Sequence, residues 1–147
     1  MRLGPAAVCY ERGVEIDDHP FATPVVVAIA AGGAIGASAR WAVAQFVDAV
    51  GAPHAAGTWP WATLVVNVVG CLLIGLAVRR LDVGTRAWAF AVTGILGGFT
   101  TFSTLAVELN DLADAERFPL AVLYGAVTLG AGVAATFVAH QPVEVGE

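Results

Sequence analysis

Two adjacent glycines, Gly97 and Gly98, come just before two threonines, Thr100 and Thr101, inside the apolar run from Trp88 to Val107. Glycine is unfavourable in a helix interior and threonine is stiff at χ1, so we expect a continuous helix to be weakened here. In lipid, backbone groups freed from a helix must be satisfied within the protein or line a cavity. Broken helices near mid-membrane form ion sites in this way. Close packing of small residues against another helix is the alternative.

Polar residues also occur within the other apolar runs. Asn67 lies near the middle of the second run, where its amide needs a partner on a neighbouring helix or in a pore. Tyr124, Thr128 and Gly132 are spaced i, i+4, i+8 and share one helix face. A packing stripe with a hydroxyl bonded to its own helix is the alternative there. Arg40, in the first run, needs an anion, a carbonyl or water unless it reaches the membrane interface.

Enzyme chemistry has little support in these residues. The three histidines lie outside the apolar runs, so none can activate Ser38 or Ser103 as a nucleophile. We place no acid at mid-membrane, because Asp48 and Glu108 come at the ends of the first and third runs. The two cysteines form no CxxC motif, and a zinc site is not expected. We therefore expect a protein that is not an enzyme.

The framework that positions these residues is apolar. Of 147 residues, 58% are hydrophobic and 13% charged, against roughly 45–50% and about 25% in globular proteins. Each of four runs has about 20 residues, enough to cross a hydrocarbon core of roughly 30 Å. A soluble domain would keep too little polar surface to cover four such helices. We predict an all-α membrane protein with four transmembrane helices, over Val25–Val47, Trp59–Val78, Trp88–Val107 and Phe118–Ala139.

The segments outside the runs set the boundaries and the orientation. We expect residues 1–24 to be a polar, disordered leader, residues 25–140 the transmembrane unit, and residues 141–147 a short tail. The net charge of −5 argues against a nucleic-acid partner. Short loops rich in Arg stay cytoplasmic, so we predict that both termini are cytoplasmic in one fixed orientation. Five arginines lie on the membrane side of the termini and the second loop, namely Arg2, Arg12, Arg79, Arg80 and Arg86. Arg117 lies on the opposite side, and Arg40, inside the first run, cannot be assigned to either side.

Three strings of residues carry a resemblance that covers residues 27–139. They are Gly32-Gly33-Ala34-Ile35-Gly36-Ala37 with Arg40, Asn67-Val68-Val69-Gly70 with Gly75, and Gly94 through Thr104 followed by Glu108. With these strings the chain resembles the Fluc (CrcB) fluoride channels. The string G-G-x-T-T-F-S-T, in the third of four short spans, is highly specific, whereas the glycine pattern and the Asn alone are weak.

The resemblance implies an antiparallel dimer with two pores in the bacterial plasma (inner) membrane. Fluoride would leave the cytoplasm passively, which relieves its toxicity. The third helix would be broken near mid-membrane, and backbone carbonyls of Gly97 and Thr100 would hold a structural sodium ion on the dimer axis. Arg40 and Glu108 would have a vestibule or structural role. The fluoride-pore residues that the resemblance implies are Asn67, Phe102, Ser103, Thr104, Tyr124 and Thr128.

Departures from the family pattern leave alternatives open. Leu105 stands where the family has a second pore Phe, and Gly132 where it has a pore Ser. Because an antiparallel homodimer needs both orientations, the Arg bias favours a heterodimer with a paralogous subunit of opposite orientation. A non-conducting assembly subunit is a second possibility. A small multidrug exporter is less favoured, because the first run contains Arg40 and no acid before Asp48.

Overall fold

The computed structural model describes residues 22–50 and 58–141, and the regular structure in this part of the chain is helical. Four helical spans here are long and apolar enough to cross a membrane: Thr23–Ala49, Trp61–Val78, Arg86–Asp114 and Phe118–His140. The first, second and fourth spans are α2, α3 and α7. The prediction of four membrane-spanning helices is therefore confirmed at the level of length and composition.

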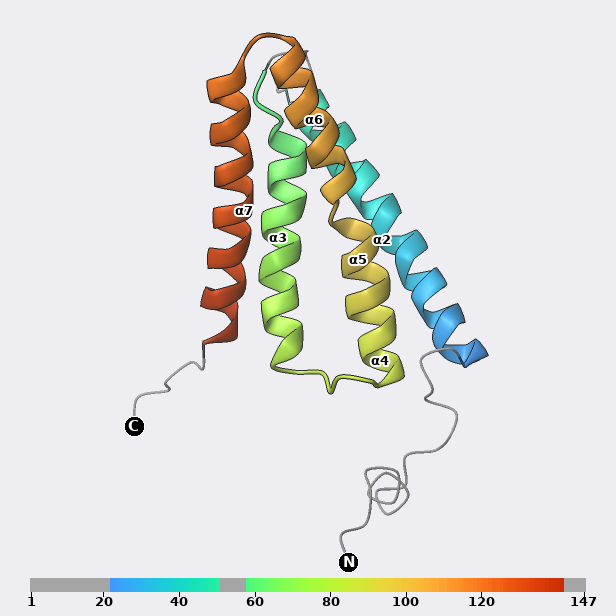
Figure 1. Cartoon of the computed structure of the whole chain (residues 1–147). Helices are drawn as coiled ribbons and strands as arrows, with labels where there is room; N and C mark the ends of the chain where they lie inside the picture. The colour runs from blue at the N-terminus through green and yellow to red at the C-terminus, as the bar shows by residue number, and fades with distance from the viewer. Residues whose placement is uncertain (1–21, 51–57, 142–147) are drawn as a thin grey trace, which may run out of the picture.

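Consecutive spans run in opposite directions (Figure 1). The start of α2, the end of α3 and the end of α7 lie at one end of the molecule, together with the turn from Arg79 to Thr85. Gly84 in this turn has φ +90°, a conformation that favours glycine. The hydroxyl of Thr85 then accepts a hydrogen bond from Trp88 N at 3.2 Å and caps the third span.

The third span is divided into several pieces. They are α4 (Arg86–Trp88), the π-helix η2 (Ala89–Leu96), α5 (Gly97–Phe99) and α6 (Phe102–Asp114). Thr100 and Thr101, between α5 and α6, have extended backbone angles of φ −74°, ψ 158° and φ −148°, ψ 122°. Thr101 caps α6, because its hydroxyl accepts from Thr104 N at 3.1 Å. We call these two residues the interruption.

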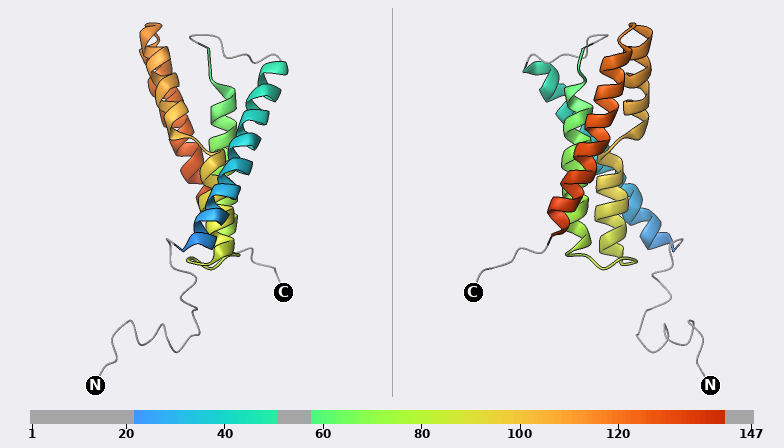
Figure 2. Two further views of the ribbon diagram at one scale, coloured as in Figure 1. Left: turned by 90° about the vertical axis from the view of Figure 1, so that its right-hand side faces the viewer. Right: turned by 60° about the vertical axis from the view of Figure 1, so that its left-hand side comes forward.

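The span changes neighbours at the interruption. Before it, η2 and α5 pack against α2, whereas α6 packs against α7. Figure 2 shows α6 and α2 diverging above this point. The contact with α2 depends on glycine, since a Cβ on Gly32 or Gly36 would overlap the carbonyl oxygen of Phe90 or Ile95. Close approach of two helix backbones requires this absence of side chains.

The most buried apolar cluster joins α6 to α7. It contains Leu105, Leu112, Ala121 and Tyr124, with Tyr124 fully buried. The ring of Trp59 packs edge-on against Tyr124, with ring centroids 5.3 Å apart. The predicted leader and tail lie outside the described residues over 1–21 and 142–147.

Candidate functional site

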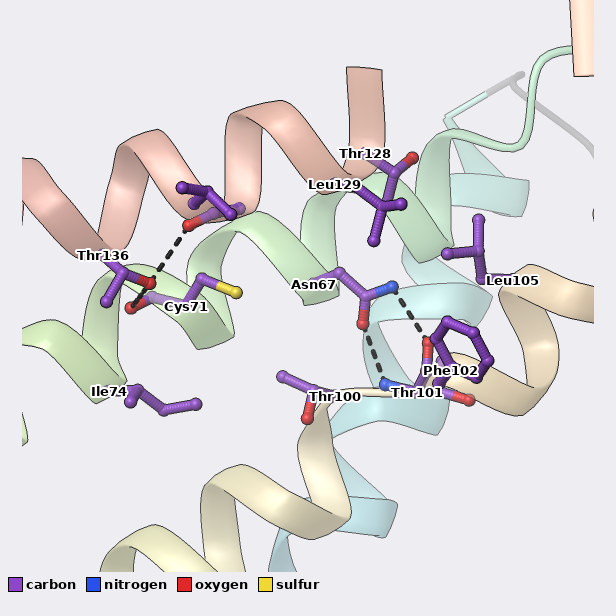
Figure 3. A pocket seen from close by; sticks show the side chains of 12 residues that line it. Asn67, Cys71, Ile74, Thr100, Thr101, Phe102, Leu105, Thr128, Leu129 and Thr136 are labelled. Carbon is purple, nitrogen blue, oxygen red and sulfur yellow. Dashed lines mark hydrogen bonds between the residues drawn. The ribbon is translucent and has the colours of Figure 1, made fainter. Parts of the chain in front are cut away.

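The side chain of Asn67 holds the interruption from α3. Its Nδ2 donates to Thr101 O at 3.0 Å, and its Oδ1 accepts from Thr101 N at 2.8 Å (Figure 3). One side chain therefore satisfies both backbone groups of a residue that has left the helix. Unsatisfied backbone groups are costly in an apolar environment, so this pairing makes the interruption possible within a membrane span.

The second carbonyl of the interruption is held from α2. Arg40 Nη1 donates to Thr100 O at 3.1 Å, and Arg40 is partly buried. Sequence analysis left a carbonyl, an anion, water or the interface as partners for this guanidinium, and the structure selects a carbonyl. Thr100 is also tied to its own helix, because its hydroxyl donates to Leu96 O at 2.9 Å. Arg40 from α2 and Asn67 from α3 thus fix the backbone between α5 and α6.

Glu108 forms a second polar centre, between α3, α6 and α7. Thr63 Oγ1 donates to Glu108 Oε1 at 2.6 Å, and Tyr124 Oη donates to Glu108 Oε2 at 2.6 Å. Only 8% of Glu108 is exposed. The apolar pattern suggested that Glu108 stands at the end of the third run, but α6 continues to Asp114. The carboxylate is therefore inside a helix and inside the protein, where charged groups require such partners.

A cavity of about 290 Å³ lies beside the interruption. α3, the interruption, the start of α6 and α7 line this α3/α7 cavity (Figure 3). Thr128 borders it and is 2% exposed, and its hydroxyl has no hydrogen-bond partner within the described residues. The predicted stripe of Tyr124, Thr128 and Gly132 is buried along its whole length. A buried hydroxyl without a protein partner can donate to a ligand.

A second cavity of about 290 Å³ opens between α2, α3 and α6. Arg40 lines it, together with Thr63, Thr101 and Thr104. The guanidinium gives this Arg40 cavity a positive charge, and the hydroxyl groups add polar atoms. Such a lining suits an anion before its water is removed.

Three of the implied pore residues begin α6. Phe102 borders the α3/α7 cavity but is 75% exposed in the single chain. Ser103 and Thr104 are also exposed, and their hydroxyl oxygens lie 3.2 and 2.9 Å from Thr101 Oγ1. Gly97 is exposed on the other side of the interruption. These residues therefore lie on the surface of the chain.

Sequence reasoning missed the role of Thr63 as a partner of Glu108. The signal was available in part, because Thr63 precedes Asn67 by one helical turn and shares its face. Cys71, one turn after Asn67, borders the α3/α7 cavity and was treated only as part of an apolar run. The sequence does not show that Thr63 meets Glu108 or that Cys71 faces α7, because each contact joins two separate spans.

Comparison with known proteins decides the family. Residues 27–140 match the family described as CrcB-like protein, Camphor Resistance (CrcB). The chain belongs to the CrcB family. The resemblance drawn from the sequence is confirmed, and the chain is a multi-pass membrane protein with bacterial relatives.

Several curated relatives carry the name Fluoride-specific ion channel FluC. One from Streptomyces avermitilis, FluC 2, is 44% identical over 113 residues, which cover 72% of this chain and 66% of the relative. A second, from Agrobacterium fabrum, is 38% identical over 116 residues, covering 76% of this chain and 90% of the relative. A third, from a Roseiflexus species, is 39% identical with the same coverage. CrcB relatives are thus named as channels, in agreement with the expectation that the chain is not an enzyme.

Proposed function

We propose that this chain is a subunit of a fluoride-selective channel through which fluoride leaves the bacterial cytoplasm passively. The observation that carries the proposal is the pairing of Asn67 with the interruption, beside a cavity that Thr128 borders; the buried hydroxyl of Thr128 has no partner among the described residues. The names of the relatives support fluoride as the ion. Such a channel relieves fluoride toxicity without an energy source.

The chemistry of the lining suits a small, strongly hydrated anion. A narrow pore must replace the water of fluoride with hydrogen-bond donors. Asn67 and Thr128 border the α3/α7 cavity and have N–H or O–H groups, whereas the hydroxyl of Tyr124 already donates to Glu108 and supports the pore from behind. The ring of Phe102 adds a positive edge without a fixed charge. A fixed cation in the pore would bind the ion too tightly for rapid release. In our proposal Ser103 and Thr104 at the start of α6 belong to the pore, and the charge of Arg40 acts in its vestibule.

The functional assembly is an antiparallel dimer with two pores. Phe102 is 75% exposed in one subunit, and as a pore residue its ring must be enclosed by protein rather than by lipid. A second four-helix subunit of opposite orientation supplies that neighbour. The interruption then lies near mid-membrane, where paired backbone groups are required.

A structural sodium ion on the dimer axis completes the proposal. Hard cations prefer oxygen ligands, and the carbonyl oxygens of Gly97 and Thr100 are of that type. The surroundings of Gly97 leave room for such an ion. Gly97 is exposed, and a Cβ added there would have one neighbouring atom within 4 Å, Val92 O at 3.7 Å. Thr100 O accepts one hydrogen bond from Arg40 and keeps a second lone pair. When bound, the ion would join two subunits through these carbonyls.

The distribution of arginine supports a heterodimer with a paralogous partner. Within the described residues, Arg79, Arg80 and Arg86 belong to the end of the molecule with the α3–α4 turn, and Arg117 to the opposite end. This bias favours one orientation with cytoplasmic termini. An antiparallel dimer then needs a second chain of opposite bias, although a homodimer remains the alternative.

A non-conducting assembly subunit is the second candidate function. Leu105 is 2% exposed and forms part of the wall of the α3/α7 cavity. Its aliphatic side chain has no donor and no positive edge, so this part of the wall gives an anion no support. In that case the chain would complete the dimer while its partner formed the conducting pore.

Fluoride efflux from liposomes tests the proposal. The purified chain alone is compared with the chain co-purified with a companion subunit, with chloride as the control ion. Selective fluoride efflux from either preparation supports the channel, and efflux from the chain alone favours a homodimer. No fluoride efflux from both preparations contradicts it. A Phe102→Ala variant that leaves efflux of the assembled dimer unchanged would favour the non-conducting subunit.

A further inference from the structure

Most hydroxyl groups around the α3/α7 cavity already donate to the protein. Those of Thr100 and Thr101 lie 2.9 Å from their acceptors, and that of Thr136 lies 3.1 Å from its nearer acceptor. One N–H of Asn67 is likewise used by Thr101 O. These hydrogens cannot also bind an ion unless the structure rearranges.

Three donors on the cavity wall remain. They are the second N–H of Asn67, the hydroxyl of Thr128 and the thiol of Cys71. The Thr128 hydroxyl is buried without a partner, and the Cys71 thiol forms no hydrogen bond with residues 22–50 or 58–141. Two independent groups on facing helices therefore leave a donor unused at the same cavity.

The positions of these donors are connected. Cys71 follows Asn67 by one turn of α3 and borders the same cavity, as Figure 3 shows. Across the helix contact, Gly132 follows Thr128 by one turn of α7. A Cβ added at Gly132 would lie 3.1 Å from Cys71 Sγ and 3.9 Å from Cys71 Cβ. The glycine therefore leaves the space that the sulfur occupies.

We propose that the thiol of Cys71 is a fluoride-binding donor of the pore, placed one helical turn beyond Asn67 by the absence of a side chain at Gly132. The inference rests on the proposed fluoride channel and names a residue of its pathway. The anion passes from Asn67 and Thr128 to the S–H group. Gly132 on α7 has no side-chain donor, and Cys71 on α3 supplies one in its place.

Substitutions at position 71 test the donor in a Cys9→Ser background, where Cys71 is the sole thiol. Cys71→Ser keeps a donor and should retain efflux. Cys71→Ala and Cys71→Val remove the donor, with Val restoring the volume, and both should reduce fluoride efflux about two- to tenfold. Efflux equal to that of the background in the Ala and Val variants would overturn the proposal.

A double variant separates a donor from a packing residue. Gly132→Ser alone places its Cβ against the sulfur, so it should lower efflux or stability. With Cys71→Ala the sulfur is absent, and the new Cβ keeps an ordinary contact of 3.9 Å with the Cβ of residue 71. Cys71→Ala with Gly132→Ser should therefore regain efflux relative to Cys71→Ala. No recovery in a double variant that folds and assembles would count against a donor at this place.

Thiol labelling gives a readout that does not need ion flux. Methyl methanethiosulfonate converts a reactive thiolate to a methyl disulfide and releases methanesulfinate, and mass spectrometry follows the product. We expect fluoride, but not chloride, to slow labelling of Cys71 in the reconstituted protein. Equal labelling rates in both salts overturn the inference. Absence of fluoride efflux from the unmodified chain and from its complex with a companion would instead contradict the proposed channel.

Discussion

Asn67 and Thr101 pair as two neighbouring peptide groups do in a β-sheet, with one hydrogen bond in each direction at 3.0 and 2.8 Å. The residues are 34 positions apart and belong to different spans. The side-chain amide replaces the helical partners that Thr101 has lost. This relationship lets a membrane span contain two extended residues, and it gives Asn67 a structural role beside the role in ion passage that we propose.

Asn67→Ala is expected to destabilise the protein. Removal of the amide leaves the N–H and C=O of Thr101 without their partner, at about 1–3 kcal/mol each, so the unfolding free energy should fall by about 2–6 kcal/mol. Unfolding in detergent measures this change, and liposome efflux should be lost. Ser38→Ala is the control, because that hydroxyl is exposed and bonds only to Ala34 of its own helix. Equal stability of the two variants would contradict the role of Asn67.

Arg40→Met should change the response to sodium. The guanidinium shares Thr100 O with the proposed ion, and two positive charges a few ångströms apart repel each other. Without that charge, the sodium concentration that gives half of the maximal stabilisation should fall by at least about tenfold. Arg40→Lys keeps the charge and serves as the matched control. A thermal-shift titration with sodium measures both variants, and identical midpoints would argue against an ion at this carbonyl.

Glu108→Ala should cost more stability than Glu108→Gln. The alanine variant leaves the buried hydroxyls of Thr63 and Tyr124 without their acceptor, which we expect to cost about 2–4 kcal/mol. Glutamine keeps one acceptor and should cost about half as much. Asp111→Asn, on the exposed side of α6, is the control. If Thr63→Val and Glu108→Ala were strictly additive in a double-mutant cycle, the two side chains would not interact.

Gly36→Ala should weaken the contact between α2 and the third span. The new Cβ would overlap Ile95 O and lie 2.8 Å from Phe99 N, so backbone has to move at a cost of about 1–3 kcal/mol. Gly33→Ala meets no atom within 4 Å and should be neutral or stabilise the helix by up to about 1 kcal/mol. Thermal unfolding of both variants in detergent provides the comparison. Tolerance of Ala at position 36 would mean that the two helices pack less closely.

The Arg bias predicts one orientation in the membrane. A green fluorescent protein fused to the C-terminus should fluoresce, and alkaline phosphatase fused there should be inactive, because the predicted orientation places this end in the cytoplasm. Exchange of Arg80 for Gln should weaken this preference without breaking a contact such as that from Arg79 Nη1 to Ala139 O. Activity of both reporters in the unchanged chain would indicate dual topology and favour a homodimer.

The sequence by itself determined the spans and the groups that needed partners. Four runs of apolar residues can cross a membrane because length and hydropathy are local properties, and the structure has helices at all four. The sequence also required a partner for Asn67 and Arg40, because neither side chain is stable alone in lipid. It could not name Thr101 and Thr100, since those partners lie on another span.

Tertiary structure decided which polar groups meet. Glu108 stood at the end of an apolar run in the sequence, yet helix packing buries it between Thr63 and Tyr124. The same packing of α3 on α7 sets the sulfur of Cys71 against Gly132. Contacts between spans depend on how each helix is rotated and at what angle the helices cross. The apolar sequence of a span does not determine these angles, because apolar side chains suit a face against lipid and a face against another helix equally well. The pathway for an ion is therefore a property of the packed helices.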